Sequence, residues 1–172
     1  MTDGDIHRYP LAWRVLHWLS ATVILWAISS GFYILLVRPS QAVIHAIADF
    51  NVAITLLFVP IFIIRILVSY LLEKPATPQL RQRQQKIANR AHALLYLMVV
   101  IVLVSGVLMM ERDMSVFGWF EVKAILSKGS LTQGFFILHR IANTVLFMLL
   151  VAHILAVVYH QIKGIPLMKR MI

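Results

Sequence analysis

The stretch "ILHRIANTVLFMLLVAHILAVVYH", residues 137–160, places three histidines in a segment that is otherwise apolar enough for the middle of a lipid bilayer. His139, His153 and His160 are fourteen and then seven residues apart. An imidazole at membrane depth costs free energy unless a partner satisfies its polar atoms. The stretch therefore predicts a membrane-spanning helix whose histidines bind a ligand or another side chain.

The rest of the chain has the composition of a membrane protein. Of its 172 residues, 60% are hydrophobic and only 13% are charged. Four apolar stretches, at about 12–37, 41–72, 87–110 and 133–160, each reach the ~20 residues that a helix needs to cross the hydrocarbon. Because lipid leaves backbone groups no other partner, these stretches predict helices, and the whole chain, 1–172, predicts a single all-α four-helix bundle. The first stretch is too long and too aromatic for a signal peptide and is expected to be retained.

The net charge of +9 indicates topology rather than nucleic-acid binding. Five basic residues lie on the side of the membrane that holds the loops following the first and third stretches. Ten fall on the side of the ends and of the linker "EKPATPQLRQRQQK" (73–86): Arg8, Arg14, Lys74, Arg81, Arg83, Lys86, Arg90, Lys163, Lys169 and Arg170. By the positive-inside rule, both termini are expected to be cytoplasmic, with anionic lipid as a partner. The opposite loop, "ERDMSVFGWFEVKAILSKGS" (111–130), is expected to lie in the outer interface as a short amphipathic segment.

The positions of the histidines suggest a cofactor bound without covalent attachment, because the chain has no cysteine. Fourteen residues leave His139 and His153 within about 40° of one helix face and ~21 Å apart. In the expected topology His17 lies level with His153, and His45 lies roughly level with His139. Two imidazole pairs, one in each leaflet, are what two bis-histidine b-type haems require.

Histidines inside a membrane can also serve roles other than haem ligation. A single intramembrane histidine can be a hydrogen-bond partner between helices. Bare zinc or copper transport would use clustered histidines and carboxylates, but Asp49, near the outer end of 41–72, is the only acidic residue inside the four apolar stretches. Gly31 and Gly106, each fourteen residues after a histidine, would let a macrocycle approach the backbone or simply allow close helix packing. Arg65 would pair with a haem propionate or extend to lipid phosphate.

Two further histidines, His92 and His160, exceed the number that two six-coordinate irons use. Both are expected on the cytoplasmic side, where they suit a quinone headgroup that needs hydrogen-bond donors and protons, or are ordinary interfacial residues. On the outer side, four cations would steer an anion to the outer haem or form a solvated loop face. These are Arg112, Lys123, Lys128 and Arg140.

Several segments together resemble the prokaryotic cytochrome b561 family, which includes bacterial superoxide oxidase. They are "LHWLSA" (16–21), "SGVLMM" (105–110), "SVFGWFEV" (115–122) and the spacing H-x13-H-x6-H on the fourth stretch. The resemblance spans nearly the whole chain. It implies a di-haem, quinone-linked protein of the bacterial inner membrane, with axial ligands at His17, His139 and His153. It also implies that His92 and His160 lie beside a quinone or another redox partner.

The fourth haem ligand departs from the family pattern. The resemblance implies a histidine about fourteen residues before an arginine at the inner end of the second helix, and Asn51 occupies that position relative to Arg65. Hairpin geometry instead favours His45, because a turn at 38–40 places His45 at the depth of Gly31. Three alternatives remain: His45 completes the outer haem site, His139 holds the haem alone or with a weak sixth ligand, or the outer haem is absent.

The function predicted from the sequence is electron transfer between a periplasmic-side donor and membrane quinone, with haem b as carrier and ubiquinone as the possible acceptor. Superoxide is one donor that the resemblance suggests, which would make the chain a quinone-linked oxidoreductase rather than only a carrier. The alternatives are a cytochrome subunit that anchors a separate dehydrogenase, and a haem-free structural or transport bundle.

Overall fold

Four long helices form the protein in the computed structural model, which describes residues 8–72 and 80–172. They are α1 (Leu11–Val37), α2 (Gln41–Leu71), α3 (Gln82–Leu108) and α4 (Ser130–Ile162). Each is long and apolar enough to cross a membrane. Part of the predicted linker, residues 73–79, lies outside the described residues. The four-helix bundle predicted from the sequence is therefore confirmed.

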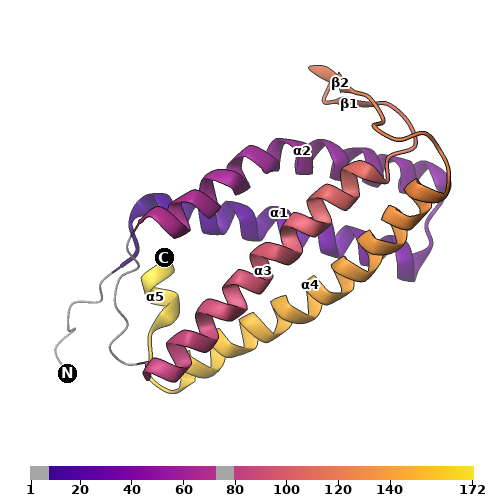
Figure 1. The fold of residues 1–172 in the computed structure, drawn as a ribbon. Helices are drawn as coiled ribbons and strands as arrows, with labels where there is room; N and C mark the ends of the chain where they lie inside the picture. Colours follow the sequence, from indigo (N-terminus) through magenta and orange to yellow (C-terminus); the bar gives the residue numbers. More distant parts are fainter. Residues whose placement is uncertain (1–7, 73–79) are drawn as a thin grey trace.

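The helices pair in sequence order, α1 against α2 and α3 against α4 (Figure 1). All four contribute to one apolar core, which contains Val23, Ile28, Phe58, Phe62, Val99 and Leu146. The outer faces are apolar as well: Leu36 is 76% exposed and Leu155 is 61% exposed. Such side chains are stable outside the bundle only where lipid surrounds them.

The structure contains two elements that the sequence did not predict. Strands β1 (Met114–Val116) and β2 (Phe120–Val122) pair antiparallel, with Ser115 opposite Glu121, in the loop between α3 and α4. The amphipathic segment expected there is thus partly a β-hairpin. We call this end of the bundle the hairpin end, and the opposite end, where α1 begins and α4 ends, the terminal end (Figure 1).

The second unpredicted element is the short helix α5 (Leu167–Met171), which lies against the start of α1. The backbone N–H of Tyr9 donates to the carbonyl of Arg170 over 3.0 Å. The indole N–H of Trp18 donates to the carbonyl of Met171 over 2.7 Å, and the guanidinium of Arg14 donates to the carbonyl of Ile172. The segment after α4 is therefore fastened to the first helix.

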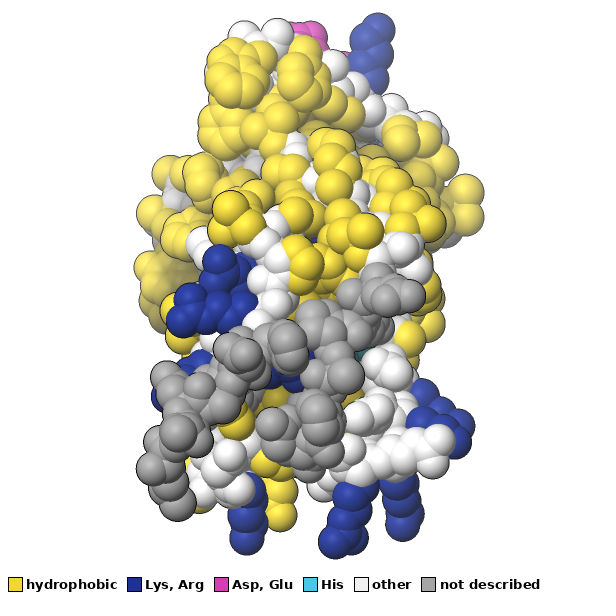
Figure 2. All heavy atoms as spheres, turned by 90° about the vertical axis from the view of Figure 1, so that its left-hand side faces the viewer, with side chains coloured by type: hydrophobic (Ala, Val, Ile, Leu, Met, Phe, Trp, Pro, Cys, Tyr) yellow, Lys and Arg dark blue, Asp and Glu magenta, His cyan; other side chains and the backbone are white. Residues whose placement is uncertain are grey.

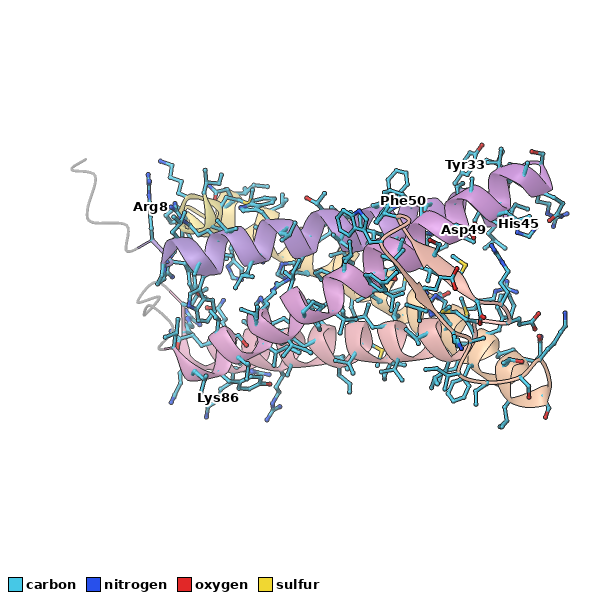
Figure 3. The ribbon with its side chains drawn as sticks, turned by 90° about the horizontal axis from the view of Figure 1, so that it is seen from above. Arg8, Tyr33, His45, Asp49, Phe50 and Lys86 are labelled. Atoms are coloured by element: carbon cyan, nitrogen blue, oxygen red, sulfur yellow. The ribbon has the colours of Figure 1, made fainter. Side chains whose placement is uncertain are left out.

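Charge is distributed as the topology argument requires. Figure 2 views the terminal end: most of the visible Lys and Arg side chains lie in the lower half, while acidic side chains are visible at the top, beside a further basic side chain. Figure 3 places Arg8 and Lys86 at the terminal end, and Tyr33, His45 and Asp49 at the hairpin end. The expectation that the terminal end faces the cytoplasm remains a prediction.

Candidate functional site

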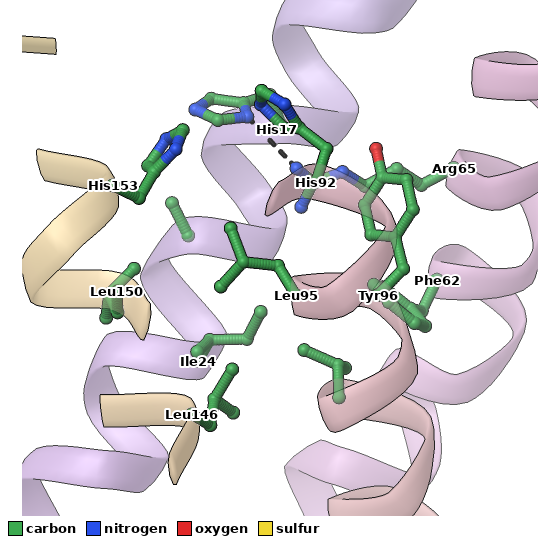
Figure 4. A pocket seen from close by; sticks show the side chains of 12 residues that line it. His17, Ile24, Phe62, Arg65, His92, Leu95, Tyr96, Leu146, Leu150 and His153 are labelled. Carbon is green, nitrogen blue, oxygen red and sulfur yellow. Dashed lines mark hydrogen bonds between the residues drawn. The ribbon is translucent and has the colours of Figure 1, made fainter. Parts of the chain in front are cut away.

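A cavity of about 60 Å³ at the terminal half of the bundle receives a histidine or arginine side chain from each helix (Figure 4). These side chains are His17 of α1, Arg65 of α2, His92 of α3 and His153 of α4. The remaining lining is apolar apart from Tyr96, and it includes Ile24, Phe62, Leu95 and Leu150. We call this space the histidine cavity. It gathers four of the residues singled out from the sequence.

His17 and Arg65 contact each other directly in the histidine cavity. The Nη2 atom of Arg65 lies 3.1 Å from Nδ1 of His17. A guanidinium can only donate, so Nδ1 accepts and the proton of a neutral His17 ring lies on Nε2. The guanidinium also stacks over the ring of Tyr96, with 5.3 Å from its central carbon to the ring centroid. Arg65 is thus held inside the bundle by His17 and Tyr96 and does not extend to lipid phosphate.

His92 and His153 also touch, because α3 and α4 are packed neighbours. Their ring centroids are 5.2 Å apart and the rings stand edge to face. Nδ1 of His92 lies 2.7 Å from the carbonyl of Ala88, one turn earlier on α3. The three imidazoles of the histidine cavity thus come from α1, α3 and α4.

His139 lies in the hairpin half of the bundle, against α3. Its Nδ1 atom is 3.0 Å from the carbonyl of Val102 and 3.2 Å from Oγ of Ser105. A Cβ atom at Gly106 would come within 3.2 Å of Cε1 of His139, so this glycine permits the close approach of the ring. Gly31 differs, because a Cβ there would meet nothing within 4 Å.

Asn51 is bound to α1 through hydrogen bonds to Trp26 and Ser30. The indole N–H of Trp26 donates to Oδ1 of Asn51 over 2.9 Å, and Nδ2 of Asn51 donates to Oγ of Ser30 over 2.8 Å. An indole nitrogen is only a donor, so the atom that it contacts must be the amide oxygen. We call these three residues the Asn51 cluster.

His45 lies nearer the hairpin end than the residues that bond to α1. Asn51 bonds to both Trp26 and Ser30 and so lies beside the turn of α1 that joins them. His45 lies six residues earlier on α2, ~9 Å farther toward the hairpin end, and its side chain is exposed (Figure 3). Within residues 8–72 and 80–172, no hydrogen bond or ring contact joins His45 to His139.

His160 is also separate from the histidine cavity. It lies in the last turn of α4, seven residues beyond His153, and its ring contacts Tyr159. Across the part of the chain that the structure describes, no three His, Cys, Asp or Glu side chains form a cluster able to hold a bare metal ion. The clustered arrangement expected for zinc or copper transport is therefore not found there.

Comparison with known proteins gives the family. A family model described as prokaryotic cytochrome b561 matches residues 8–172. The chain belongs to the prokaryotic cytochrome b561 family. It is also 28% identical over 124 residues to "Cytochrome b561 homolog 2" of Escherichia coli (strain K12), an alignment that covers 70% of this chain. That alignment covers 66% of the relative, just under two thirds of its length.

Membership in the cytochrome b561 family makes this chain a multi-pass inner-membrane protein, and the cofactor of that family is b-type haem. The histidine cavity fits this cofactor by the chemistry of its donors, which are imidazoles from α1 and α4, apolar walls and one guanidinium. A cofactor of this size needs several hundred Å³. The walls of the 60 Å³ cavity must therefore move apart when haem enters.

The hairpin half fits the cofactor less completely. His139 offers one imidazole, and its Nδ1 contact with a backbone carbonyl is the usual way in which a protein orients a ligating histidine. No second histidine lies opposite it among the residues that the structure describes. The sequence pattern located His139 but not the Trp26 and Ser30 contacts of Asn51, since these depend on the rotation of α1 against α2.

Proposed function

We propose that this cytochrome b561 passes electrons between a donor at the hairpin end, on the periplasmic side, and membrane quinone beside the histidine cavity. The observation that carries the proposal is the convergence of His17, Arg65, His92 and His153 from four helices on one cavity. His17 and His153 would be the axial ligands of the inner haem, and haem supplies one-electron storage at a fixed depth. Superoxide is one donor compatible with this direction of transfer.

The surrounding residues of the chain position and isolate that haem. Phe62, Ile24 and Leu150 provide apolar walls that exclude water. Ligation through Nε2 of His17 would place the ring proton on Nδ1, which could then no longer accept from Arg65. Arg65 would then need another acceptor, which a haem propionate could supply. His92, beside His153, would hold and deliver protons to the quinone oxygen.

The first test is a visible spectrum of the purified protein. A Soret band and an α-band after dithionite reduction are expected, and a pyridine haemochrome titration counts haem per chain. Reduction by added ubiquinol, or reoxidation by ubiquinone, then tests the link to quinone. Absence of these bands would contradict the proposal. Copurification with a soluble dehydrogenase would favour an anchoring role instead.

Replacing Arg65 with glutamine is expected to lower the midpoint potential of the inner haem. A unit charge about 10 Å away at an effective dielectric constant near 20 is worth about 1.7 kcal/mol, or about 70 mV for one electron. A redox titration monitored at the α-band measures the change. Arg65→Lys keeps the charge and is the control. Equal shifts in both variants would contradict a charge effect.

Replacing His92 with alanine is expected to slow quinone reduction by about 100-fold, as for the loss of a general acid or base, without changing the haem count. His160→Ala is the matched variant at the same end of the bundle. Because His160 lies outside the cavity, its effect is expected to be smaller. Stopped-flow reduction of ubiquinone compares the two, and equal rates would argue that quinone binds nearer the membrane surface.

A further inference from the structure

Arg65 carries a positive charge into the membrane-spanning part of the bundle without an acidic partner. It lies six residues before Leu71, the last residue of α2, which is ~9 Å along the helix axis. From such a position an arginine side chain ordinarily extends to the phosphates of the membrane surface. No acidic side chain among residues 8–72 and 80–172 forms an ion pair with Arg65. Other groups must therefore keep its guanidinium inside the histidine cavity.

Two contacts hold the guanidinium there, and they differ in chemistry. Nη2 of Arg65 lies 3.1 Å from Nδ1 of His17, and the central carbon lies 5.3 Å from the centroid of the Tyr96 ring. In Figure 4 the Arg65 side chain passes the ring of Tyr96 and ends beside His17. The contact with His17 needs a free lone pair on Nδ1, which ligation through Nε2 would remove. The contact with Tyr96 uses the face of the ring and does not depend on the protonation of His17.

The ring of Tyr96 is itself held in place by α2. It stands edge to face against Phe62, with 5.8 Å between the ring centroids. Phe62 is 2% exposed, and its ring packs on that of Phe58 at 5.4 Å. On α3, Tyr96 lies one turn after His92, and both residues line the histidine cavity. A ring packed in this way presents its face to Arg65 at a constant position.

We propose that Tyr96 is a positioning residue, which keeps the charge of Arg65 inside the histidine cavity and thereby raises the midpoint potential of the inner haem. The proposal rests on the proposed function, since it assumes haem ligation by His17 and His153. Reduction adds one electron to the site, and a nearby positive charge favours the reduced state. Without the ring of Tyr96, the Arg65 side chain can turn outward to lipid phosphate. Its charge then acts over a longer distance and through a more polar medium.

The first measurement is the midpoint potential of the inner haem, titrated at the α-band in the full-length protein. Tyr96→Leu removes the ring face and is expected to lower the potential by about half or more of the shift in Arg65→Gln. Tyr96→Phe keeps the ring face and is the matched control, with a potential close to that of the wild type. In the Arg65→Gln background, Tyr96→Leu should cause no further shift, because the charge that it positions is gone. An unchanged potential in Tyr96→Leu, or an equal shift in both backgrounds, would overturn the inference.

The second measurement follows Arg65 without using haem. Phenylglyoxal modifies guanidinium groups that are accessible from water, and peptide mass spectrometry gives the rate at each arginine. Arg65 should be protected in the wild type and in Tyr96→Phe, and should react about tenfold faster in Tyr96→Leu. Arg83, which is exposed at the same end of the bundle, should react equally in all three proteins if the fold is intact.

The two measurements separate the possible failures. Equal protection of Arg65 in all three proteins would overturn the inference. A wild type without haem bands would instead overturn the proposed function, and the labelling would still decide whether Tyr96 holds Arg65. If Tyr96→Leu does not fold, Tyr96→Met removes the ring with a smaller loss of side-chain length, and the same outcomes apply to it.

Discussion

Replacing His153 with alanine is expected to remove the inner haem and to abolish electron transfer to quinone. His153 and His17 line the histidine cavity from α4 and α1, and they are the proposed ligands of the inner haem. Loss of a residue that only orients a ligand costs about 10–100-fold in affinity, so loss of the ligand should cost more. Haem content should fall by one equivalent.

The control for His153→Ala is His160→Ala, on the same helix but outside the cavity. It should retain both haems. Low-temperature electron paramagnetic resonance of the oxidised protein separates the two cases, because the low-spin signal of the inner haem disappears only in the first. Retention of that signal in His153→Ala would show that His17 has a different partner.

A second large effect is expected from Gly106→Val. A Cβ atom at this position would come within 3.2 Å of Cε1 of His139, and the neighbouring backbone carbonyl of Val102 already fixes the ring. The valine branches would push the imidazole away from α3. Overpacking of this kind costs about 1–3 kcal/mol of stability, and the displaced imidazole should release the outer haem.

Gly31→Val is the matched control for Gly106→Val, because Gly31 has open space where a Cβ would lie. Pyridine haemochrome titration should give one haem in Gly106→Val and two in Gly31→Val. Thermal unfolding in detergent compares their stability. If Gly106→Val kept both haems, the close contact with His139 would not be important for haem binding.

The helices could be predicted from the sequence because length and hydropathy alone determine where a chain can cross lipid. The ends of the helices were harder to predict. Helix α3 begins at Gln82, within the polar run "QRQQK", where no apolar pattern indicates a helix. The hairpin strands are only three residues each, too short for an alternating pattern.

The candidate site shows the same division. Spacing along one helix was enough to put His139 and His153 on one wall, since the helix repeat is fixed. Spacing was not enough to predict contacts between helices, because these depend on how α1 and α2 slide and rotate against each other. Symmetric hairpin geometry could therefore suggest His45 as a neighbour of Gly31, but it could not predict the bonds of Asn51 to Trp26 and Ser30.

The attachment of α5 to the start of α1 has a consequence for assembly. The helices pair as α1 with α2 and α3 with α4, while the histidine cavity needs imidazoles from α1 and α4. The bonds from Tyr9 and Trp18 to the α5 segment join the first helix to the last, and α5 is synthesised after every spanning helix. The newly inserted bundle thus lacks this fastening until translation has passed α4.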